Sequence, residues 1–369
     1  MARTESFPMS SAFASTLRAA LVLAASLTTV GAQAASATLP PKRPAQACAA
    51  VTPATCALAQ ALGRGINLGN MLDPPQEGDW GVRLEPAYIG LVAGAFSTVR
   101  LPVRWSNHAA PTADATLDPV FAARVDKAID ALLAKGVYVI VDVHHYSQLS
   151  GDNLHPNEFA VDPGVLETRL VNMWRQIGQR YKDRSPKLLF ELLNEPHERL
   201  DGQAWNELAA RTLAVVRQSN PTRAVLIGPG YWNSVRDLPK LRLPPDRNLI
   251  VAIHNYDPFP FTHQGVMHLP KPFPTGTTCC DAAQRKAITD ALDAARRWSQ
   301  ENGYPLHLGE FGTYNAADLA SRANYARLVR DEAERRGIGW AYWDFAADFG
   351  MYSPETNTWV EPIRRALLD

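Results

Sequence analysis

The chain has 369 residues with 37 basic and 37 acidic side chains, so its formal net charge is zero. This balance offers no electrostatic attraction for nucleic acid or for an anionic membrane surface, and we expect neither as a partner. The sequence contains no internal repeat, low-complexity tail or second module. We therefore expect a single folded domain after the N-terminal segments.

The first 34 residues have the three parts of a secretory signal peptide. Arg3 and Arg18 precede an alanine-rich apolar run over residues 19–30, and an Ala-Gln-Ala cleavage site ends the segment. The apolar run is too short to span a membrane as a helix. We therefore predict a secreted protein, extracellular or periplasmic, with no membrane attachment after cleavage. Residues 35–61 are predicted to be an N-terminal leader or linker.

Four cysteines in an exported chain allow three pairings, which the sequence does not distinguish. We favour a local disulfide between Cys48 and Cys56, which leaves Cys279 and Cys280 as a vicinal bridge or as free thiols. Long-range pairing is the open alternative. No spacing of cysteine and histidine here is typical of a zinc site.

From residue 62 to the C-terminus, short apolar runs alternate with segments of helical periodicity. The runs typical of buried strands are residues 65–69, 98–103, 137–143, 188–193, 224–228, 249–254, 306–311 and 339–345. Helical periodicity is clearest over residues 119–135, 164–181, 204–218, 282–301 and 318–336. This alternation favours parallel strands, and eight units over about 300 residues predict an α/β fold, a (β/α)8 TIM barrel spanning residues 62–369. The competing doubly wound sheet lacks a glycine-rich fingerprint after its first strand.

Polar and aromatic side chains end all but the fifth of the predicted strands. In a (β/α)8 barrel the active site lies at the C-terminal mouth, where the strands end. The candidate residues, in chain order, are Asn67, Asn70, Asp73, Arg100, Arg104, Asp142, His144, His145, Asn194, Glu195, His254, Tyr256, His263, Glu310, Trp343 and Asp344.

Two glutamates in this set occupy equivalent positions. Glu195 and Glu310 each close a short apolar run. Carboxylates are rarely left in apolar surroundings without a partner or a function. The pair therefore suggests a general acid and a nucleophile on either side of one glycosidic bond. The alternative interpretation is that each glutamate belongs to a structural ion pair.

Several stretches together resemble glycoside hydrolase family 5, whose members are mostly endo-acting cellulases and mannanases. They are GRGINLGNML, STVRLPVRWS, VIVDVHHY, LLNEP, IHNYDPFPFTHQG, HLGEFG and WAYWDF. The resemblance runs from residue 63 almost to the C-terminus. The surroundings of Asp73, Trp80 and His263 are similar to the subgroup of bacterial endoglucanases that act on both glucan and mannan.

The resemblance implies a retaining mechanism, with Glu195 as the general acid/base and Glu310 as the nucleophile. It implies supporting roles for Arg100, His144, Asn194, His254 and Tyr256. It implies substrate contacts at Asn70, Asp73, His145, His263 and Trp343. We expect Arg100 to keep Glu310 ionised, and apolar surroundings to raise the pKa of Glu195.

The paired histidines and the paired tryptophans have alternative interpretations. The alternatives for His144 and His145 are core histidines or a metal pair. No third ligand stands at metal spacing, so we expect no metal and no cofactor. Strand alternation places Trp340 and Trp343 on opposite faces, so we expect one of them in the core.

The sequence therefore predicts a secreted, monomeric, retaining endo-β-1,4-glucanase that acts on cellulose or another β-glucan. Asp73 and His268 depart from the family pattern, where glutamate and an aromatic residue are commoner. Both positions belong to the cleft, so β-mannan and xyloglucan stay open as alternative substrates. A barrel that binds polysaccharide without cleaving it is a third alternative, but it would require the loss of Glu195, Glu310 or Arg100, and all three are present.

Overall fold

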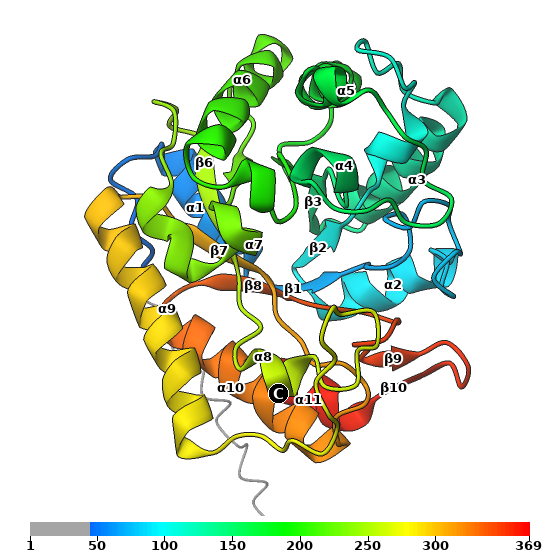
Figure 1. Cartoon of the computed structure of the whole chain (residues 1–369). Coiled ribbons are helices and arrows are strands. Elements are labelled where there is room, and N and C mark those ends of the chain that lie inside the picture. Colours follow the sequence, from blue (N-terminus) through cyan, green and yellow to red (C-terminus); the bar gives the residue numbers. More distant parts are fainter. Residues whose placement is uncertain (1–44) are drawn as a thin grey trace, which may run out of the picture. The chain divides into compact units, whose positions relative to one another are not determined.

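Eight parallel strands close into a barrel in the order β1 to β8, with helices packed around it (Figure 1). The computed structural model describes residues 45–369, so the predicted signal peptide lies outside the described residues. The strands are β1 (Arg64–Asn67), β2 (Thr98–Leu101), β3 (Tyr138–Asp142), β4 (Leu188–Glu191), β5 (Val225–Ile227), β6 (Leu249–His254), β7 (Leu306–Glu310) and β8 (Gly339–Tyr342). The predicted α/β class and (β/α)8 TIM barrel are confirmed.

The five helices predicted from periodicity all form, with additional elements between them. The helices are α1 (Pro53–Leu62), α2 (Pro86–Ala95), α3 (Pro119–Ala134), α4 (Ser147–Ser150), α5 (Leu166–Tyr181), α6 (Gln203–Ser219), α7 (Gly230–Asn233), α8 (Phe259–Thr262), α9 (Ala282–Asn302), α10 (Leu319–Arg335) and α11 (Glu361–Leu368). A short hairpin of β9 (Tyr352–Ser353) and β10 (Thr358–Trp359) follows β8. Within residues 45–369, no helix combines the length and the apolar character needed to cross a bilayer.

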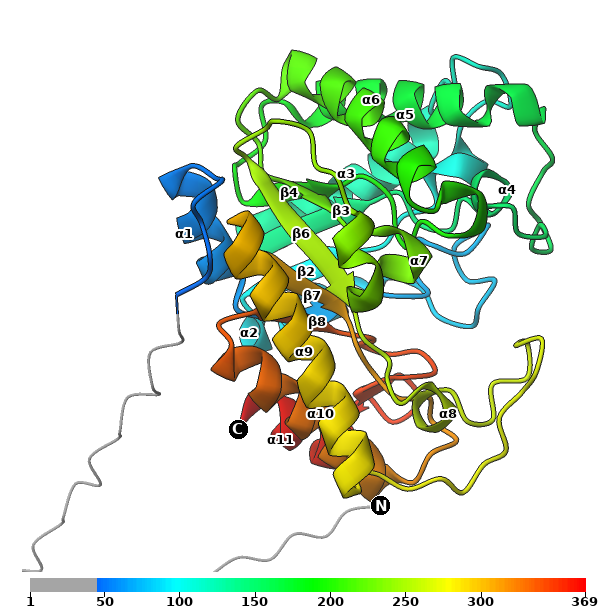
Figure 2. The ribbon, with the colours of Figure 1, turned by 60° about the vertical axis from the view of Figure 1, so that its left-hand side comes forward.

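Helix α1 closes the barrel at the end where the strands begin (Figure 2). The Thr52 side chain caps its N-terminus, and a proline occupies its first turn, where no amide donor is needed. Ala59 and Leu62 are fully buried in one cluster with apolar side chains of β3 to β6. The prediction of a leader or linker is therefore wrong for residues 53–61, which form part of the folded domain.

The two disulfides follow the favoured pairing. Cys48 is bonded to Cys56, which ties the segment before α1 to that helix, and Cys279 is bonded to Cys280 ahead of α9. No cysteine among the described residues is free. The favoured Cys48–Cys56 pairing is confirmed, and of the two outcomes left open for Cys279 and Cys280 the structure has the vicinal bridge.

The barrel interior has an apolar layer near α1 and a polar layer toward the mouth. Because side chains alternate along a strand, every second residue points into the barrel. The apolar layer contains Ile140, Leu189, Ala224, Leu226, Ile250 and Ala252. The next inward positions hold Asn67, Arg100, Asp142, Glu191 and His254, all of them buried. The sequence thus delivers polar groups to the same depth on neighbouring strands.

Strand β7 reaches the mouth through a change of register. Leu306 and Leu308 pack in the outer cluster that includes side chains of α9, so simple alternation would direct Glu310 outward as well. The pairing with β6 shifts at this point, because Ile253 is opposite Leu308 whereas His254 is opposite Glu310. This irregularity re-aims the Glu310 side chain toward the interior.

The role of α1 as the barrel floor can be tested with Leu62→Ala. This change leaves a cavity beneath the apolar layer and should lower the free energy of unfolding by about 2–5 kcal/mol. Leu58→Ala removes the same atoms from a half-buried position on the same helix and should cost less. Urea unfolding followed by circular dichroism measures both. Equal losses of unfolding free energy in the two variants would contradict the role of α1 in closing the barrel end.

Candidate active site

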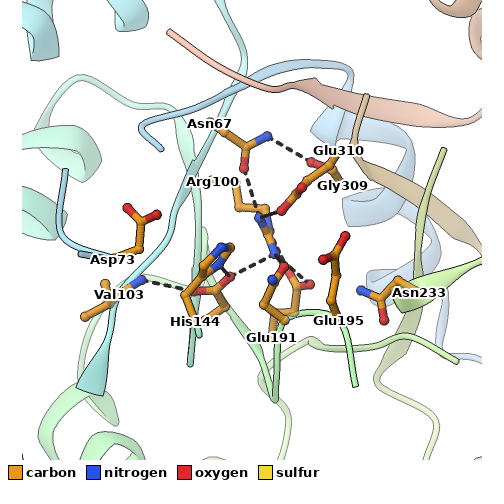
Figure 3. A network of polar contacts seen from close by, with 12 residues as sticks. Asn67, Asp73, Arg100, Val103, His144, Glu191, Glu195, Asn233, Gly309 and Glu310 are labelled. Carbon is orange, nitrogen blue, oxygen red and sulfur yellow. Dashed lines mark hydrogen bonds and ion pairs between the residues drawn. The ribbon is translucent and has the colours of Figure 1, made fainter. Parts of the chain in front are cut away.

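The guanidinium of Arg100 is the centre of the polar layer (Figure 3). The side chain, on β2, has no exposed surface. It contacts three carboxylates: Nε donates to Glu191 Oε2 at 2.8 Å, Nη1 donates to Glu310 Oε1 at 2.7 Å, and Nη2 lies 2.8 Å from Asp142 Oδ2. Two amide oxygens, of Asn67 and Asn194, also accept from it at 3.0 and 2.8 Å. These carboxylates raise the pKa of Arg100 and outweigh the opposing effect of burial, so it is cationic.

Glu310 is held by donors on both of its oxygens. Arg100 donates to Oε1, and the hydroxyl of Tyr256 donates to Oε2 at 2.9 Å. The Nδ1 atom of His254 lies 3.7 Å from Oε2. Only 4% of the residue is exposed. The contacts with Arg100 and Tyr256 together fix the plane of the Glu310 carboxylate.

Glu195 approaches the same point from the end of β4. Its Oε1 lies 2.7 Å from Nδ1 of His254, and its side chain is 24% exposed, more than that of Glu310. The backbone at Glu195 has a φ of 47°, a conformation that costs free energy for a residue other than glycine. One oxygen of Glu195, one oxygen of Glu310 and a ring nitrogen of His254 all lie within 4.8 Å of one another.

The short separation of the two carboxylates has an electrostatic consequence. Burial raises the pKa of both Glu195 and Glu310 to about 7, because the carboxylate anion is less stable away from water than the neutral acid is. The expected rise for Glu195 is confirmed. Arg100 and the Tyr256 hydroxyl act on Glu310 in the expected direction and lower its pKa, but burial is the larger effect. Near neutral pH the pair therefore tends to hold one proton between its members.

His254 is fixed by its neighbours on both ring nitrogens. The side-chain amide nitrogen of Asn233, in α7, lies 3.4 Å from Nε2. An amide nitrogen only donates, so Nε2 accepts and Nδ1 carries the hydrogen that faces Glu195. Burial lowers the pKa of His254, which keeps the ring neutral. The predicted orienting role of His254 rests on these contacts.

Trp343 and His144 form the opposite wall of the mouth. Their rings stack with centroids 5.6 Å apart and an angle of 6° between planes. Gly69 is required here, because a Cβ at that position would lie 2.7 Å from the Trp343 ring. His144 Nδ1 lies 2.9 Å from Asp142 Oδ2, so the ring orientation is set by the carboxylate that also contacts Arg100. Trp340 is buried on the other face of β8, as predicted.

Asp73, Asn70 and His145 lie beside that wall. Asp73 is fully buried, which contradicts the expectation of an open cleft residue. Its Oδ1 accepts from the amide of Met71, whereas Oδ2 has no hydrogen-bond partner and lies 3.8 Å from Nε2 of His145. Burial raises the pKa of Asp73 to about 8. Asn70 and His145, both partly exposed, have φ angles of 61° and 52°.

His263 packs beside Tyr256, the residue that donates to Glu310. Its ring packs edge-on against Tyr256, with centroids 5.0 Å apart, and its Nδ1 lies 3.0 Å from the hydroxyl of Thr262. Burial lowers the pKa of His263 to about 3. These contacts orient His263 against Tyr256, and the residue is partly exposed.

Some site residues were missed or had no predicted role. Glu191 makes the two-oxygen contact with Arg100, and its inward position on β4 was a usable signal. Asn233 comes after a strand for which no functional residue was predicted. Trp232, the residue before it, is 39% exposed and stacks on His197 with centroids 4.5 Å apart. Its backbone also has a positive φ, 57°, which no sequence pattern indicates.

The site combines a close carboxylate pair at the mouth of a (β/α)8 barrel with a buried arginine beneath it and a tryptophan beside it. This combination is typical of barrels that cleave glycosidic bonds. The family model described as Cellulase (glycosyl hydrolase family 5) matches residues 69–348. The chain belongs to glycosyl hydrolase family 5.

Named relatives support this assignment. The chain is 32% identical over 319 residues to Endoglucanase H of Acetivibrio thermocellus, covering 85% of this chain and 33% of that protein. It is 31% identical over 331 residues to Cellulase/esterase CelE of the same organism, covering 82% and 39%. The chain thus spans between about a third and two fifths of the length of these two relatives.

Solved structures are similar over nearly their whole length. The structure of Thermotoga maritima Cel5A in complex with cellobiose has a TM-score of 0.79 and 37% identity, covering 84% of this chain and 99% of that chain. The structure of the same protein in complex with mannotriose gives the same TM-score, identity and coverage.

The raised pKa of Glu195 predicts a stability effect of Glu195→Gln. In the parent, the unfolded state loses this proton near its ordinary pKa of 4.5 and the folded state only near 7. Between these values the folded state binds more protons, so its stability falls as pH rises and levels off above 7. The variant has no such proton, so it should become more stable than the parent by about 1–3 kcal/mol at pH 8.

The control is Glu207→Gln, which changes an exposed glutamate on α6. Denaturant unfolding at pH 4, 6 and 8 should show a widening difference only for Glu195→Gln. A difference that is the same at all three pH values would show that desolvation of Glu195 is not its cause.

Proposed function

We propose that this protein is a retaining endo-β-1,4-glucanase in which Glu195 is the general acid/base and Glu310 the nucleophile. The observation that carries the proposal is the separation of the two carboxylates, with oxygens within 4.8 Å of each other. Retaining glycosidases place their carboxyl groups about 5–5.5 Å apart, whereas inverting enzymes leave about 6.5–9.5 Å for a water molecule. The pair here is too close for the inverting arrangement.

The first step joins the sugar to the protein. An oxygen of Glu310 attacks the anomeric carbon as the glycosidic carbon–oxygen bond breaks, and Glu195 gives its proton to the leaving oxygen. This requires a protonated Glu195 and an ionised Glu310. The contacts favour that distribution, because Arg100 and Tyr256 both donate to Glu310. Glu195 has one neutral imidazole partner and is the more exposed of the two.

The second step releases the sugar. Glu195, now ionised, takes a proton from a water molecule as that water attacks the anomeric carbon and the bond to Glu310 breaks. Nδ1–H of His254 donates to the Glu195 carboxylate and holds it in place for both proton transfers. The anomeric configuration is inverted twice, so it is retained overall.

The walls of the mouth supply sugar-binding groups. The Trp343 ring offers a flat apolar face, and the exposed Trp232 offers another on the side of Glu195. Asn194 accepts from Arg100 through its oxygen, which leaves its amide hydrogens to donate to a sugar hydroxyl next to the cleaved bond. Asn70 and His145, partly exposed on the opposite wall, are suited to bind hydroxyls further along the chain.

We also propose that the protein is secreted and acts as a monomer on polymeric β-1,4-glucan. The signal-peptide pattern and the two disulfides support export, because disulfides persist in oxidising compartments. The endoglucanase names of similar proteins support the glucan substrate.

A second candidate substrate is β-1,4-mannan. The similar Thermotoga maritima protein is described in complex with both cellobiose and mannotriose. A mannose unit carries its 2-hydroxyl axially, on the other face of the ring, which changes the contact available to Asn194. The same two glutamates would cleave either chain.

The assignment of Glu310 is tested by Glu310→Gln. The amide has no nucleophilic oxygen anion, so turnover of carboxymethyl-cellulose should be abolished while cello-oligosaccharide binding, measured by calorimetry, persists. Glu198→Gln is a matched control, because Glu198 is exposed and only three residues beyond Glu195. Full activity of Glu310→Gln would refute the mechanism.

The assignment of Glu195 is tested by the leaving group. Glu195→Gln should lower the rate on cello-oligosaccharides about 10²–10⁴-fold, because a general acid is lost. An aryl cellobioside with an acidic phenol needs no protonation, so its first step should be spared and a burst of phenol should appear. NMR of the first products from the parent enzyme should show retained configuration, and an inverted product would contradict the carboxylate spacing.

Substrate preference is tested by comparing kcat/KM on cellohexaose and mannohexaose. We expect the glucan to be favoured, because Asn194 is already fixed by Arg100 in one orientation. Equal values would support dual specificity. A preference for mannohexaose would replace the glucanase assignment with a mannanase assignment and leave the mechanism intact.

A further inference from the structure

Three side chains of the kind that bind metal ions gather on the wall of the mouth away from Glu195. They are Asp73, in the loop after β1, and His144 and His145, at the end of β3. One ligand atom from each lies within 4.8 Å of the other two. The paired histidines were visible in the sequence, but the third group comes from a distant part of the chain and only the fold brings it near. Figure 3 shows Asp73 and His144 on one side of Arg100, with Glu195 on the other.

The carboxylate of Asp73 is incompletely satisfied. The side chain is fully buried, and Oδ1 accepts from the Met71 amide at 3.0 Å. Oδ2 has no hydrogen-bond partner, and its separation of 3.8 Å from His145 Nε2 is too long for a hydrogen bond. A buried carboxyl oxygen without a partner is unfavourable, and a bound cation would satisfy it.

His144 has the orientation typical of a metal ligand. Its Nδ1 is bound to Asp142, whose own position is fixed by Arg100, which leaves Nε2 as the nitrogen that can accept. A carboxylate behind an imidazole is the usual support for a metal-binding histidine, because it fixes both the tautomer and the ring plane. Stacking on Trp343 holds the ring further.

His145 is the most exposed member of the group. Its side chain is 33% exposed, and its ring packs edge-on against Trp80 and His144, with centroids 5.3 and 4.2 Å away. The nearby cation Arg104 donates to the backbone oxygen of Asp73 at 2.6 Å and would repel a metal ion. Arg104 is itself paired with Glu158, which reduces that repulsion.

We propose that Asp73, His144 and His145 form a binding site for a divalent transition-metal ion such as Zn²⁺. Two imidazoles and one carboxylate are a common ligand set for such ions, which complete their coordination with water. The site shares His145 and the Trp343 wall with the proposed sugar-binding groups, so a bound ion should compete with the polysaccharide. The expected competition with polysaccharide rests on the proposed function, whereas metal binding itself does not.

A second group, Glu195, His254 and Glu310, is equally compact, and it is the other candidate cluster among the described residues. Its atoms are already engaged. Glu310 accepts from Arg100 and Tyr256, and Nδ1 of His254 faces Glu195. No buried oxygen of this group lacks a partner. The Asp73 group is therefore the better site, and the other group provides the matched control.

The test is metal binding to the full chain without a histidine tag and without sugar. Zn²⁺ affinity is measured by calorimetry and Co²⁺ coordination by visible absorption. We expect one ion per chain, an affinity at least about tenfold weaker in Asp73→Asn and in His145→Gln, and an unchanged affinity in Glu310→Gln. Circular dichroism verifies that each variant folds. Unchanged binding in both Asp73→Asn and His145→Gln, loss of binding in Glu310→Gln, or no binding at millimolar metal would each overturn the site.

Competition is measured separately, with the parent enzyme. Zn²⁺ should raise the apparent KM for a cello-oligosaccharide without lowering kcat, and EDTA should reverse the effect. If Zn²⁺ binds at the Asp73 group but leaves KM unchanged, the overlap with the sugar site is wrong and the metal site stands. An enzyme without hydrolytic activity would refute the proposed function, and the binding result would be unaffected.

Discussion

One buried guanidinium holds the polar layer of this barrel together. Arg100 contacts Asp142, Glu191 and Glu310, so a single fixed positive charge is shared among three carboxyl groups in a region without solvent. An arginine suits this role because its planar group donates in several directions and stays cationic when buried. Its charge does not balance three anions. Burial accordingly raises the pKa of Asp142 to about 6 and that of Glu310 to about 7.

This excess of carboxyl groups has a functional consequence. With Glu195 beside Glu310, the mouth contains more potential negative charge than its cation can neutralise, so a proton is retained at a pH where exposed glutamates have lost theirs. Burial alone would protonate either glutamate. The unequal donors decide which one keeps the proton, because Arg100 and Tyr256 stabilise only the anion of Glu310. The apolar layer and α1 lie below these groups and exclude water, which keeps the pKa values of the carboxyl groups raised.

The sequence predicted the barrel well because its signals are local. Apolar runs and helical periodicity located every barrel strand, and the strand ends located both glutamates, Arg100 and His254. Features that depend on tertiary structure were not accessible in this way. The register shift that turns Glu310 inward, the positive φ of Glu195 and the burial of Asp73 have no local pattern. Helix α1 was mistaken for a linker because its apolar face makes sense only against the closed barrel end.

The two walls of the mouth are linked through Asp142. One of its oxygens, Oδ2, lies 2.8 Å from Nη2 of Arg100 and 2.9 Å from Nδ1 of His144. In a buried network such bonds polarise one another, so a group that binds Nε2 of His144 strengthens the bond from Nδ1 to Asp142. Asp142 thus connects the wall that carries His144 and Trp343 to the guanidinium that also contacts Glu310.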